Sequence, residues 1–201
     1  LDLKEIARIT GHCGIETEVF IHGALCYSYS GLCLLSSHLL GRSGNRGRCA
    51  YCCRQPFQDH AGRENHPFAL KDLSRAAYLP DLLQAGVSSL KIEGRMRGPV
   101  YVAAVTDAYR RLLDGTLSEA ERRRFSADLQ TIFYRSTTDL NLRKTDENPF
   151  DADSAGHRGA FLGTVQSLQD GWMILHSNRE IWNQVEFLID DADTQMLGIH
   201  G

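Results

Sequence analysis

The residues most able to do chemistry are cysteines, and five of the six lie within residues 18–54. Six residues separate Cys26 from Cys33, and fifteen more precede Cys49. Cys52 and Cys53 follow directly after a two-residue gap. The chain opens on LDLKEIARIT, which lacks the apolar stretch of a secretory signal. Clustered cysteines in such a chain more often bind a metal than form disulfides. We therefore expect metal or iron–sulfur ligation in a cytoplasmic protein, ahead of disulfides or idle core thiols.

The spacing of the thiols leaves two occupants open. Structural zinc sites use pairs of cysteines separated by about two to four residues. Cys49 forms such a pair with Cys52 or Cys53, whereas the gap between Cys26 and Cys33 is longer. Four thiolates gathered from two loops would suit an iron–sulfur cluster equally well. Cys13 has no partner close in sequence, so we expect it to be a bystander.

Charged residues on two predicted strands form a second candidate set. Residues 18–22 and 87–93 alternate in the manner of strands, with apolar Val19, Ile21, Leu90 and Ile92 on one face. The opposite face would point into a barrel and carries Glu18, His22, Lys91 and Glu93. Catalytic groups of such barrels sit at the strand ends, where Arg95 and Arg97 follow and could hold a carboxylate or phosphate. The plainer interpretation is a buried Lys–Glu ion pair.

Helices and strands alternate over residues 1–134. The pattern predicts helices at 3–10, 34–40, 72–79, 80–85, 99–115 and 118–129, with the strands at 18–22 and 87–93 between them. Alternation of this kind is typical of an α/β fold with parallel strands covered by helices. A complete (β/α) barrel needs about 250 residues, so we expect the C-terminal half of a TIM-like barrel, its N-terminal half missing.

The remainder of the chain has a different composition. Residues 135–157 are polar and rich in turn formers, which predicts a linker. Three short apolar segments within 158–201 predict a small antiparallel β module. A net charge of −3 gives no overall attraction to nucleic acid, although arginines cluster locally, as at Arg42, Arg46 and Arg48. No apolar run is long enough for a transmembrane helix, so we expect no membrane partner.

Three motifs in this order resemble those of the peptidase U32 family, the collagenase-like group. The first, E-x-F-x-x-G-A-x-C-x-x-x-x-G-x-C-x-x-S, spans Glu18 to Ser36. The others are NRGRC-x-x-x-CR at Asn45–Arg54 and SLKIEGRMR at Ser89–Arg97. The later GHRGAFLGTV, at Gly156–Val165, is similar to the start of the β module in many members.

The resemblance implies a TIM-barrel-like core and, as in several members, a 4Fe–4S cluster. Its ligands would be Cys26, Cys33, Cys49 and Cys53, with Cys52 as an extra thiol that could replace the fourth ligand. Members are described as collagen-degrading peptidases, as proteins that hydroxylate a tRNA uridine or a ribosomal cytidine with prephenate as a needed metabolite, or as helpers of ubiquinone hydroxylation.

The residues themselves argue against ordinary proteolysis. The chain has no HExxH zinc motif, no G-x-S-x-G elbow, and no evident Cys–His pair outside the predicted ligands. Our first hypothesis is therefore an iron–sulfur protein that hydroxylates C5 of a pyrimidine in tRNA or rRNA. In it, Lys91, Glu93 and Arg95, with His22 and Glu18, would bind or polarise the small-molecule donor or the base. A collagenase-like peptidase and a zinc-stabilised scaffold without catalysis are the alternatives.

Overall fold

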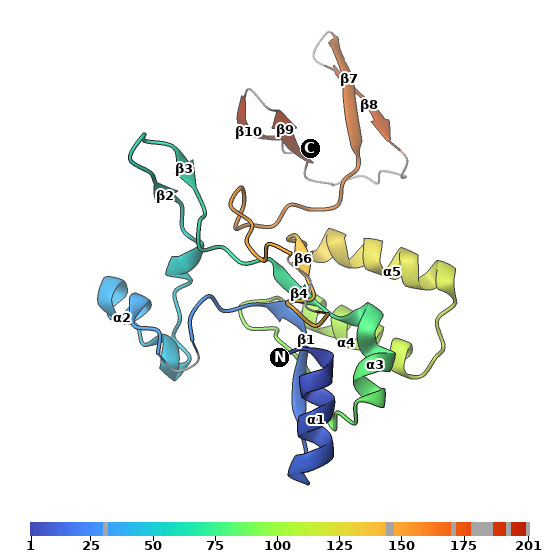
Figure 1. Ribbon diagram of the computed structural model, residues 1–201. Coiled ribbons are helices and arrows are strands. Elements are labelled where there is room, and N and C mark those ends of the chain that lie inside the picture. Colours follow the sequence, from blue (N-terminus) through green and yellow to red (C-terminus); the bar gives the residue numbers. More distant parts are fainter. Residues whose placement is uncertain (30–31, 144–146, 170–171, 178–186, 192–193, 200–201) are drawn as a thin grey trace.

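The computed structural model describes residues 1–29, 32–143, 147–169, 172–177, 187–191 and 194–199. A four-stranded sheet with the order β5-β1-β4-β6 forms its centre (Figure 1). Its strands are β1 (Glu18–Ala24), β4 (Asp72–Ser74), β5 (Ser89–Ile92) and β6 (Thr137–Thr138). β1 runs parallel to β5, and β4 runs parallel to β6, but β1 and β4 are antiparallel. The α/β class is confirmed, whereas the all-parallel arrangement expected of half a barrel is not found in this sheet.

β4 occupies residues for which the sequence predicts a helix starting at Asp72. Leu73 explains the difference: it pairs with Gly23 of β1 on one side and Thr138 of β6 on the other, and it is 3% exposed. Two ladders and a buried side chain outweigh the local signal of an N-capping aspartate. The helix predicted at 72–79 is therefore wrong over β4, whereas a 3-10 turn follows at Ala76–Tyr78 and α3 begins at Leu79 (Leu79–Gln84).

Helices cover the sheet where local signals predict them. In α1 (Leu3–Cys13) the Asp2 side chain accepts from the Glu5 amide at 2.7 Å, which confirms the predicted capping box. α4 (Pro99–Leu113) begins with proline in its first turn, and Ser118 caps α5 (Glu119–Ile132). Their apolar faces meet β1 in one buried core, formed by Ile6, Ile21, Leu79, Leu82, Val87, Tyr101, Val105, Tyr109 and Leu142.

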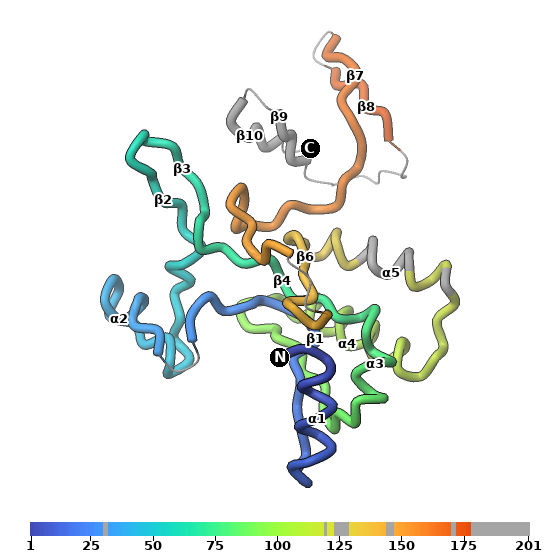
Figure 2. The backbone as a smooth tube through the Cα atoms, viewed as in Figure 1, coloured from blue at the N-terminus to red at the C-terminus, as the bar shows by residue number. Residues whose placement is uncertain are grey.

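The cysteine-rich region lies on the other side of the sheet from α3 and α5 (Figure 2). It contains α2 (Leu35–Leu40), two 3-10 turns at Gly44–Arg46 and Cys52–Arg54, and a hairpin of β2 (Phe57–Gln58) with β3 (Glu64–Asn65). These elements are short, and several of their large apolar side chains are exposed, including Leu32, Leu34, Leu39 and Leu40. The region therefore consists mainly of loops and turns, and these leucines do not form an apolar core within it.

The segment 135–157, predicted as a linker, contributes to the main sheet. β6 pairs with β4, and the Leu142 side chain is 1% exposed within the core. Beyond it, β7 (Gly163–Gln169) pairs antiparallel with β8 (Trp172–Ser177), and β9 (Phe187–Asp191) pairs antiparallel with β10 (Thr194–Ile199). The predicted antiparallel strands are present, as two separate two-stranded sheets. None of the described helices combines the length and apolar character that a membrane crossing requires.

Candidate functional site

The loop around Cys49 holds its thiol with backbone and hydroxyl groups. The Tyr51 amide donates to Cys49 Sγ at 3.3 Å, and Tyr51 itself has a φ of 55°, which is unusual for a bulky residue. Ser36 Oγ accepts from the Ala50 amide at 3.0 Å, and Ser36 is 2% exposed. These contacts fix the position of the Cys49 sulfur in the loop that leads into the Cys52–Arg54 turn.

Cys53 and Cys52 face different surroundings, although they are neighbours in sequence. Burial raises the pKa of the Cys53 thiol, the Arg54 charge opposes this, and nearby Cys49 and Cys26 raise it further. Three of the four predicted ligands thus lie within electrostatic reach of one another. Cys52 is 5% exposed, and its Sγ lies 3.8 Å from the hydroxyl of Ser36. Cys53 thus lies near Cys49 and Cys26, while Cys52 shares the Ser36 hydroxyl with Cys49, whose Sγ is 3.9 Å from it.

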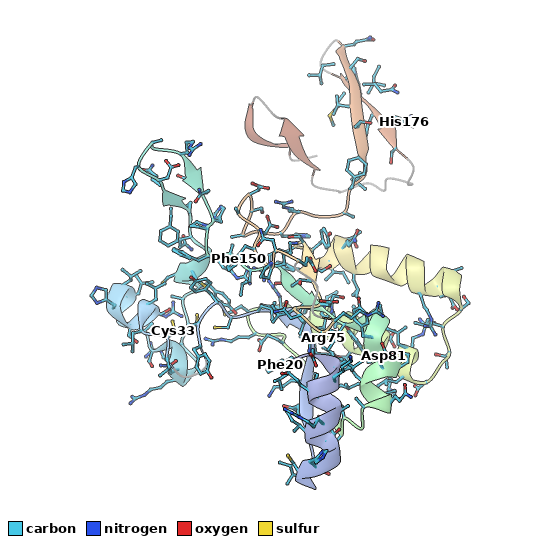
Figure 3. The ribbon with its side chains drawn as sticks, in the orientation of Figure 1. Phe20, Cys33, Arg75, Asp81, Phe150 and His176 are labelled. Carbon is cyan, nitrogen blue, oxygen red and sulfur yellow. The ribbon has the colours of Figure 1, made fainter. Side chains whose placement is uncertain are left out.

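Cys33 is half-buried beside α2 (Figure 3). All six cysteines are free, so none is held in a disulfide. Within the described ranges, no three side chains of His, Cys, Asp or Glu are arranged to hold a metal ion. The chemistry of the donors suits a metal or cluster, but the four thiols are not assembled around one point. The ligand set therefore stays a prediction.

Glu18 and Lys91 form an ion pair on the open face of the sheet. Lys91 Nζ lies 2.9 Å from Glu18 Oε1 and 5.0 Å from the centre of the Phe20 ring. Hydrogen bonds from Lys91 and then Ser89 lower the pKa of Glu18. Both charged side chains are 48% exposed, so the pair is half-open to solvent. The buried Lys–Glu pair that the sequence allowed is thus an accessible one, and Lys91 pairs with Glu18 rather than Glu93.

His22 does not share this face, because β1 shifts its register between Phe20 and His22. Such a bulge breaks the alternation of side chains on which the sequence prediction rested. Arg75 stabilises it: its amide donates to Ile21 O at 2.9 Å and its guanidinium to Phe20 O at 3.2 Å. The imidazole of His22 instead lies against α4, with Nδ1 3.3 Å from the Tyr109 hydroxyl.

Burial decides the charge of His22. Desolvation lowers its pKa to about 4, the nearby Asp72 carboxylate opposes the shift, and Arg97 adds to it. The imidazole is consequently neutral at neutral pH. It can exchange a hydrogen bond with a partner but carries no positive charge to offer an anion.

Glu93 and Arg95 connect the end of β5 to the cysteine-rich region. Glu93 Oε1 accepts from the Arg95 amide at 2.7 Å, and the Arg95 guanidinium reaches the Gly47 carbonyl in the glycine-rich loop. The backbone of Glu93 also packs closely against Gly23 of β1, and only glycine allows this contact. Gly23 has a φ of +112°, and a Cβ there would lie 2.2 Å from the Glu93 carbonyl oxygen. The ends of β1 and β5 therefore meet without any side chain between them.

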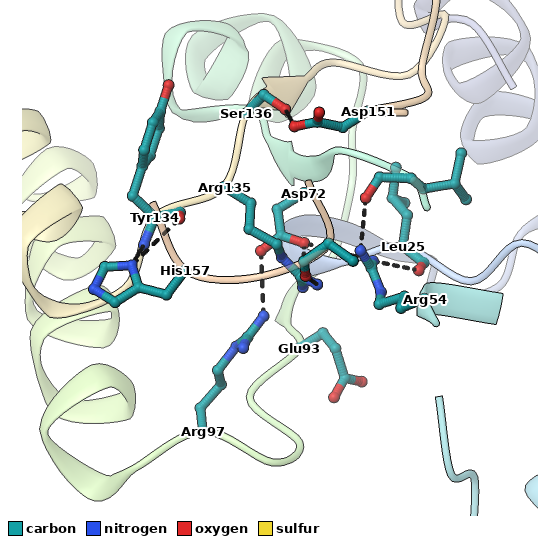
Figure 4. A network of polar contacts seen from close by, with 12 residues as sticks. Leu25, Arg54, Asp72, Glu93, Arg97, Tyr134, Arg135, Ser136, Asp151 and His157 are labelled. Atoms are coloured by element: carbon teal, nitrogen blue, oxygen red, sulfur yellow. Dashed lines mark hydrogen bonds and ion pairs between the residues drawn. The ribbon is translucent and has the colours of Figure 1, made fainter. Parts of the chain in front are cut away.

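An arginine cluster lies at the centre of the molecule. The sequence indicates one member, Arg97, as able to hold a carboxylate, but it does not reveal the cluster. Arg54, Arg97 and Arg135 surround Asp72 (Figure 4). Arg135 lies 2.6 Å from the carboxylate, Arg97 3.3 Å and Arg54 3.8 Å. Arg54 also donates to the carbonyls of Leu70 and Leu25. One available signal was Arg54 itself, the final residue of the NRGRC-x-x-x-CR motif.

The arginine cluster joins the cysteine region to the sheet. Arg54 directly follows Cys53, and the carbonyl of Leu25 that it binds directly precedes Cys26. The same nitrogen, Nη2, lies 3.8 Å from the Asp72 carboxylate at the start of β4. Two of the predicted cluster ligands are therefore held in place by the same buried guanidinium.

Comparison with known proteins assigns the family. The sequence profile of peptidase family U32 matches residues 1–150. The chain is 40% identical over 170 residues to "23S rRNA 5-hydroxycytidine C2501 synthase" of Escherichia coli (76% of this chain, 26% of that protein). It is 41% identical over 129 residues to "tRNA hydroxylation protein P1" of Bacillus subtilis (58% of this chain, 31% of that protein).

A further relative bears a different name, "Collagenase" of Porphyromonas gingivalis, with 37% identity over 145 residues (64% of this chain, 40% of that protein). No solved structure matches the chain. The chain spans a quarter to two fifths of the length of these relatives. The match over residues 1–150 includes the cysteine loops, the sheet and the arginine cluster, and it shows that the chain belongs to peptidase family U32.

Proposed function

We propose that this chain is part of an RNA-modification protein that hydroxylates C5 of a pyrimidine in tRNA or rRNA. The observation that carries the proposal is the 40% identity, over 170 residues, to a protein named for making 5-hydroxycytidine in rRNA. A tRNA hydroxylation protein at 41% identity supports the same substrate class. The whole protein, of which this chain matches only a part, would carry the activity.

The cofactor proposed for this site is a 4Fe–4S cluster held by Cys26, Cys33, Cys49 and Cys53. Two observations support this set of ligands. Cys49 and Cys26 lie close enough to Cys53 to raise the pKa of its thiol, and the Tyr51 N–H donates to the Cys49 sulfur. Hydrogen bonds to sulfur tune the potential of such clusters. The cluster would supply one-electron redox chemistry. Zinc on the same thiols, in a scaffold without catalysis, is the competing occupant.

The polar residues of β1 and β5 are proposed to bind the reacting molecules. Lys91 and Glu18 offer an accessible ammonium and carboxylate on the open sheet face, next to the exposed ring of Phe20. Glu93 and Arg95 lie at the end of the same strand, against the glycine-rich loop. Prephenate, the metabolite implied by the family resemblance, is the proposed donor. Neutral His22 lies against α4 and not on the face of Lys91, so its proposed role is that of a hydrogen-bonding group on the α4 side of β1.

Proteolysis is the second candidate, because one relative is named a collagenase. The side chains give it little support. The Nδ1 atom of His22 faces a tyrosine hydroxyl, and its pKa of about 4 makes it a poor base at neutral pH. A peptidase would need its nucleophile and base from other parts of the protein.

Mass spectrometry of RNA from a strain lacking the full-length gene tests the function. We expect one hydroxypyrimidine to disappear, the wild-type gene to restore it, and Cys33→Ser to leave it absent. Cys13→Ser is the matched control, because Cys13 is exposed in α1 and outside the ligand set. Unchanged RNA in the deletion strain would refute hydroxylation.

The cofactor is tested separately, on protein purified without oxygen. Iron and sulfide analysis should find about four of each per chain, and the count should fall in Cys53→Ser but not in Cys52→Ser. A colourless protein that contains stoichiometric zinc would contradict the 4Fe–4S cluster and favour the structural zinc site. Because this readout does not depend on RNA, it separates the cofactor from the reaction.

A further inference from the structure

The arginine cluster carries more positive than negative charge. Arg54, Arg97 and Arg135 are opposed by the Asp72 carboxylate, and all four side chains are at most 11% exposed. Asp151 nearby is already paired with Arg158 at 3.0 Å. Even if half-buried Glu93 is counted with Asp72, the three guanidiniums outnumber the two carboxylates. A buried surplus of charge is costly unless an anion completes it.

Two donors of the cluster also lack acceptors. The Nε atoms of Arg97 and Arg135 are buried, and no group in the described ranges accepts a hydrogen bond from either. The other nitrogens of Arg135 are used: one donates to Asp72 at 2.6 Å and one to the Ala155 carbonyl at 3.2 Å. Orphaned N–H groups on buried arginines are rare, because each loses its hydration without replacement. The Arg97 guanidinium lies 3.4 Å from the centre of the Phe133 ring, so Arg135, which lines a cavity, is the member of the cluster that an oxyanion can reach.

A cavity of about 370 Å³ opens beside Arg135. It lies between the sheet and helices α4 and α5, and its volume falls in the range of roughly 300–1,000 Å³ typical of small-molecule sites. Its wall combines a second cation with aromatic rings and polar groups, among them Arg122, His22, Tyr101, Phe133 and Tyr134. Asp72 of β4 also lines the cavity, and the arginine cluster neutralises this carboxylate, the only one that lines the cavity within the described part of the chain.

We infer that this cavity binds a small organic anion with a flat apolar body and a carboxylate or phosphate group. The oxyanion would accept from Arg135, with Arg122 as a second cation in the lining, because guanidinium geometry matches both carboxylate and phosphate. The apolar body would lie among Phe133, Tyr101 and Leu129. Neutral His22 adds a hydrogen-bonding group without adding charge. The inference does not depend on RNA modification or on a cluster, since the residues involved are not the proposed cluster ligands.

Calorimetric titration of the full-length protein tests the site with three probes that share one ring: benzoate, phenyl phosphate and benzyl alcohol. We expect at least one anion to bind with a dissociation constant below about 1 mM and the alcohol to bind at least about tenfold more weakly. Binding of benzoate alone identifies a carboxylate site, and binding of phenyl phosphate alone identifies a phosphate site. Absence of binding by both anions, or equal binding of the alcohol, would overturn the inference.

Two variants connect the binding to the cavity. Arg135→Lys keeps the charge beside Asp72 but loses the fork of donors, and we expect at least about tenfold weaker binding. Arg122→Gln changes an exposed wall residue, so it remains informative if the first variant unfolds, and it should weaken binding about threefold to tenfold. Arg110→Gln is the matched control, because this exposed arginine of α4 is bonded to Asp114 and does not line the cavity. If the anion binds both arginine variants as tightly as the control, its site lies elsewhere.

Discussion

The arginine cluster and the cysteine loops hold their polar groups in opposite ways. Around Asp72 the charged side chains are buried and bonded to partners from four distant segments of the chain. In the cysteine loops, Cys26 is exposed, Cys33 is half-buried, and short 3-10 turns replace regular elements. The first region is built to hold fixed charges within the fold. The second presents reactive groups whose proposed partner is not a protein side chain.

The largest expected effect comes from breaking the arginine cluster. Asp72→Asn would leave three buried guanidiniums without their shared counter-ion, and removing one partner of a buried ion pair costs about 3–5 kcal/mol. Chemical denaturation should show a correspondingly lower free energy of unfolding. Asp114→Asn, which removes an exposed partner of Arg110, is the control and should leave stability unchanged. Equal stability of the two variants would mean that the cluster is not electrostatically coupled.

The next effect concerns pH and His22. Its pKa is about 4 in the folded chain against 6.5 when exposed, so the unfolded state binds the proton first as pH falls. The stabilisation from neutral His22 is complete above about pH 6.5 and is lost progressively towards pH 4, to a maximum of about 3 kcal/mol. The free energy of unfolding, measured between pH 4 and 6.5, should therefore decrease as the pH falls. In His22→Gln it should depend less on pH over this range. An unchanged pH profile in the variant would assign the titration to another group.

A change at Gly23 should have a smaller but clear effect on the junction between the two regions. Gly23→Ala places a Cβ on a residue with a φ of +112°, which L side chains rarely adopt, and 2.2 Å from the Glu93 carbonyl oxygen, so β1 and β5 must separate. We expect a loss of about 1–3 kcal/mol in stability. Gly11→Ala is a matched control, since its Cβ would meet nothing within 4 Å in helix α1, and it should stabilise slightly. Thermal melting of both variants measures the difference.

The smallest effect is expected on the open sheet face. Lys91→Met removes an ion pair whose two members are 48% exposed, and exposed pairs contribute little to stability. The melting temperature should stay the same, while RNA hydroxylation by the full-length protein should fall if the proposed role of Lys91 is correct. A lowered melting temperature together with normal hydroxylation would instead make the pair structural.

Local signals allowed much of the fold to be predicted from the sequence. The capping box at Asp2, the proline that opens α4 and the strand that follows Glu18 all depend on residues close together in the chain. β4 was missed because its three residues are stabilised by ladders to β1 and β6. The mixed direction of the sheet follows from that same strand, so no local pattern could reveal it.

The candidate site divides in the same way. The thiols and the residues around Lys91 could be found because their types and spacing are visible in the sequence. The orientation of His22 could not, since a register shift reverses the expected face and leaves no mark in the period of two. The arginine cluster joins residues as far apart as Arg54 and Arg135, and only the fold brings them together.

The adjacency of Cys53 and Arg54 has a mechanical consequence. Consecutive Cα atoms are about 3.8 Å apart, so the thiol cannot move far without pulling on the guanidinium beside it. That guanidinium donates to the carbonyls of Leu70 and Leu25 and lies 3.8 Å from the Asp72 carboxylate, so withdrawing it would break both hydrogen bonds and move a positive charge away from its counter-ion. The stiffness of the cysteine loop at this point is therefore set by electrostatics, and not by the apolar packing that restrains the helices.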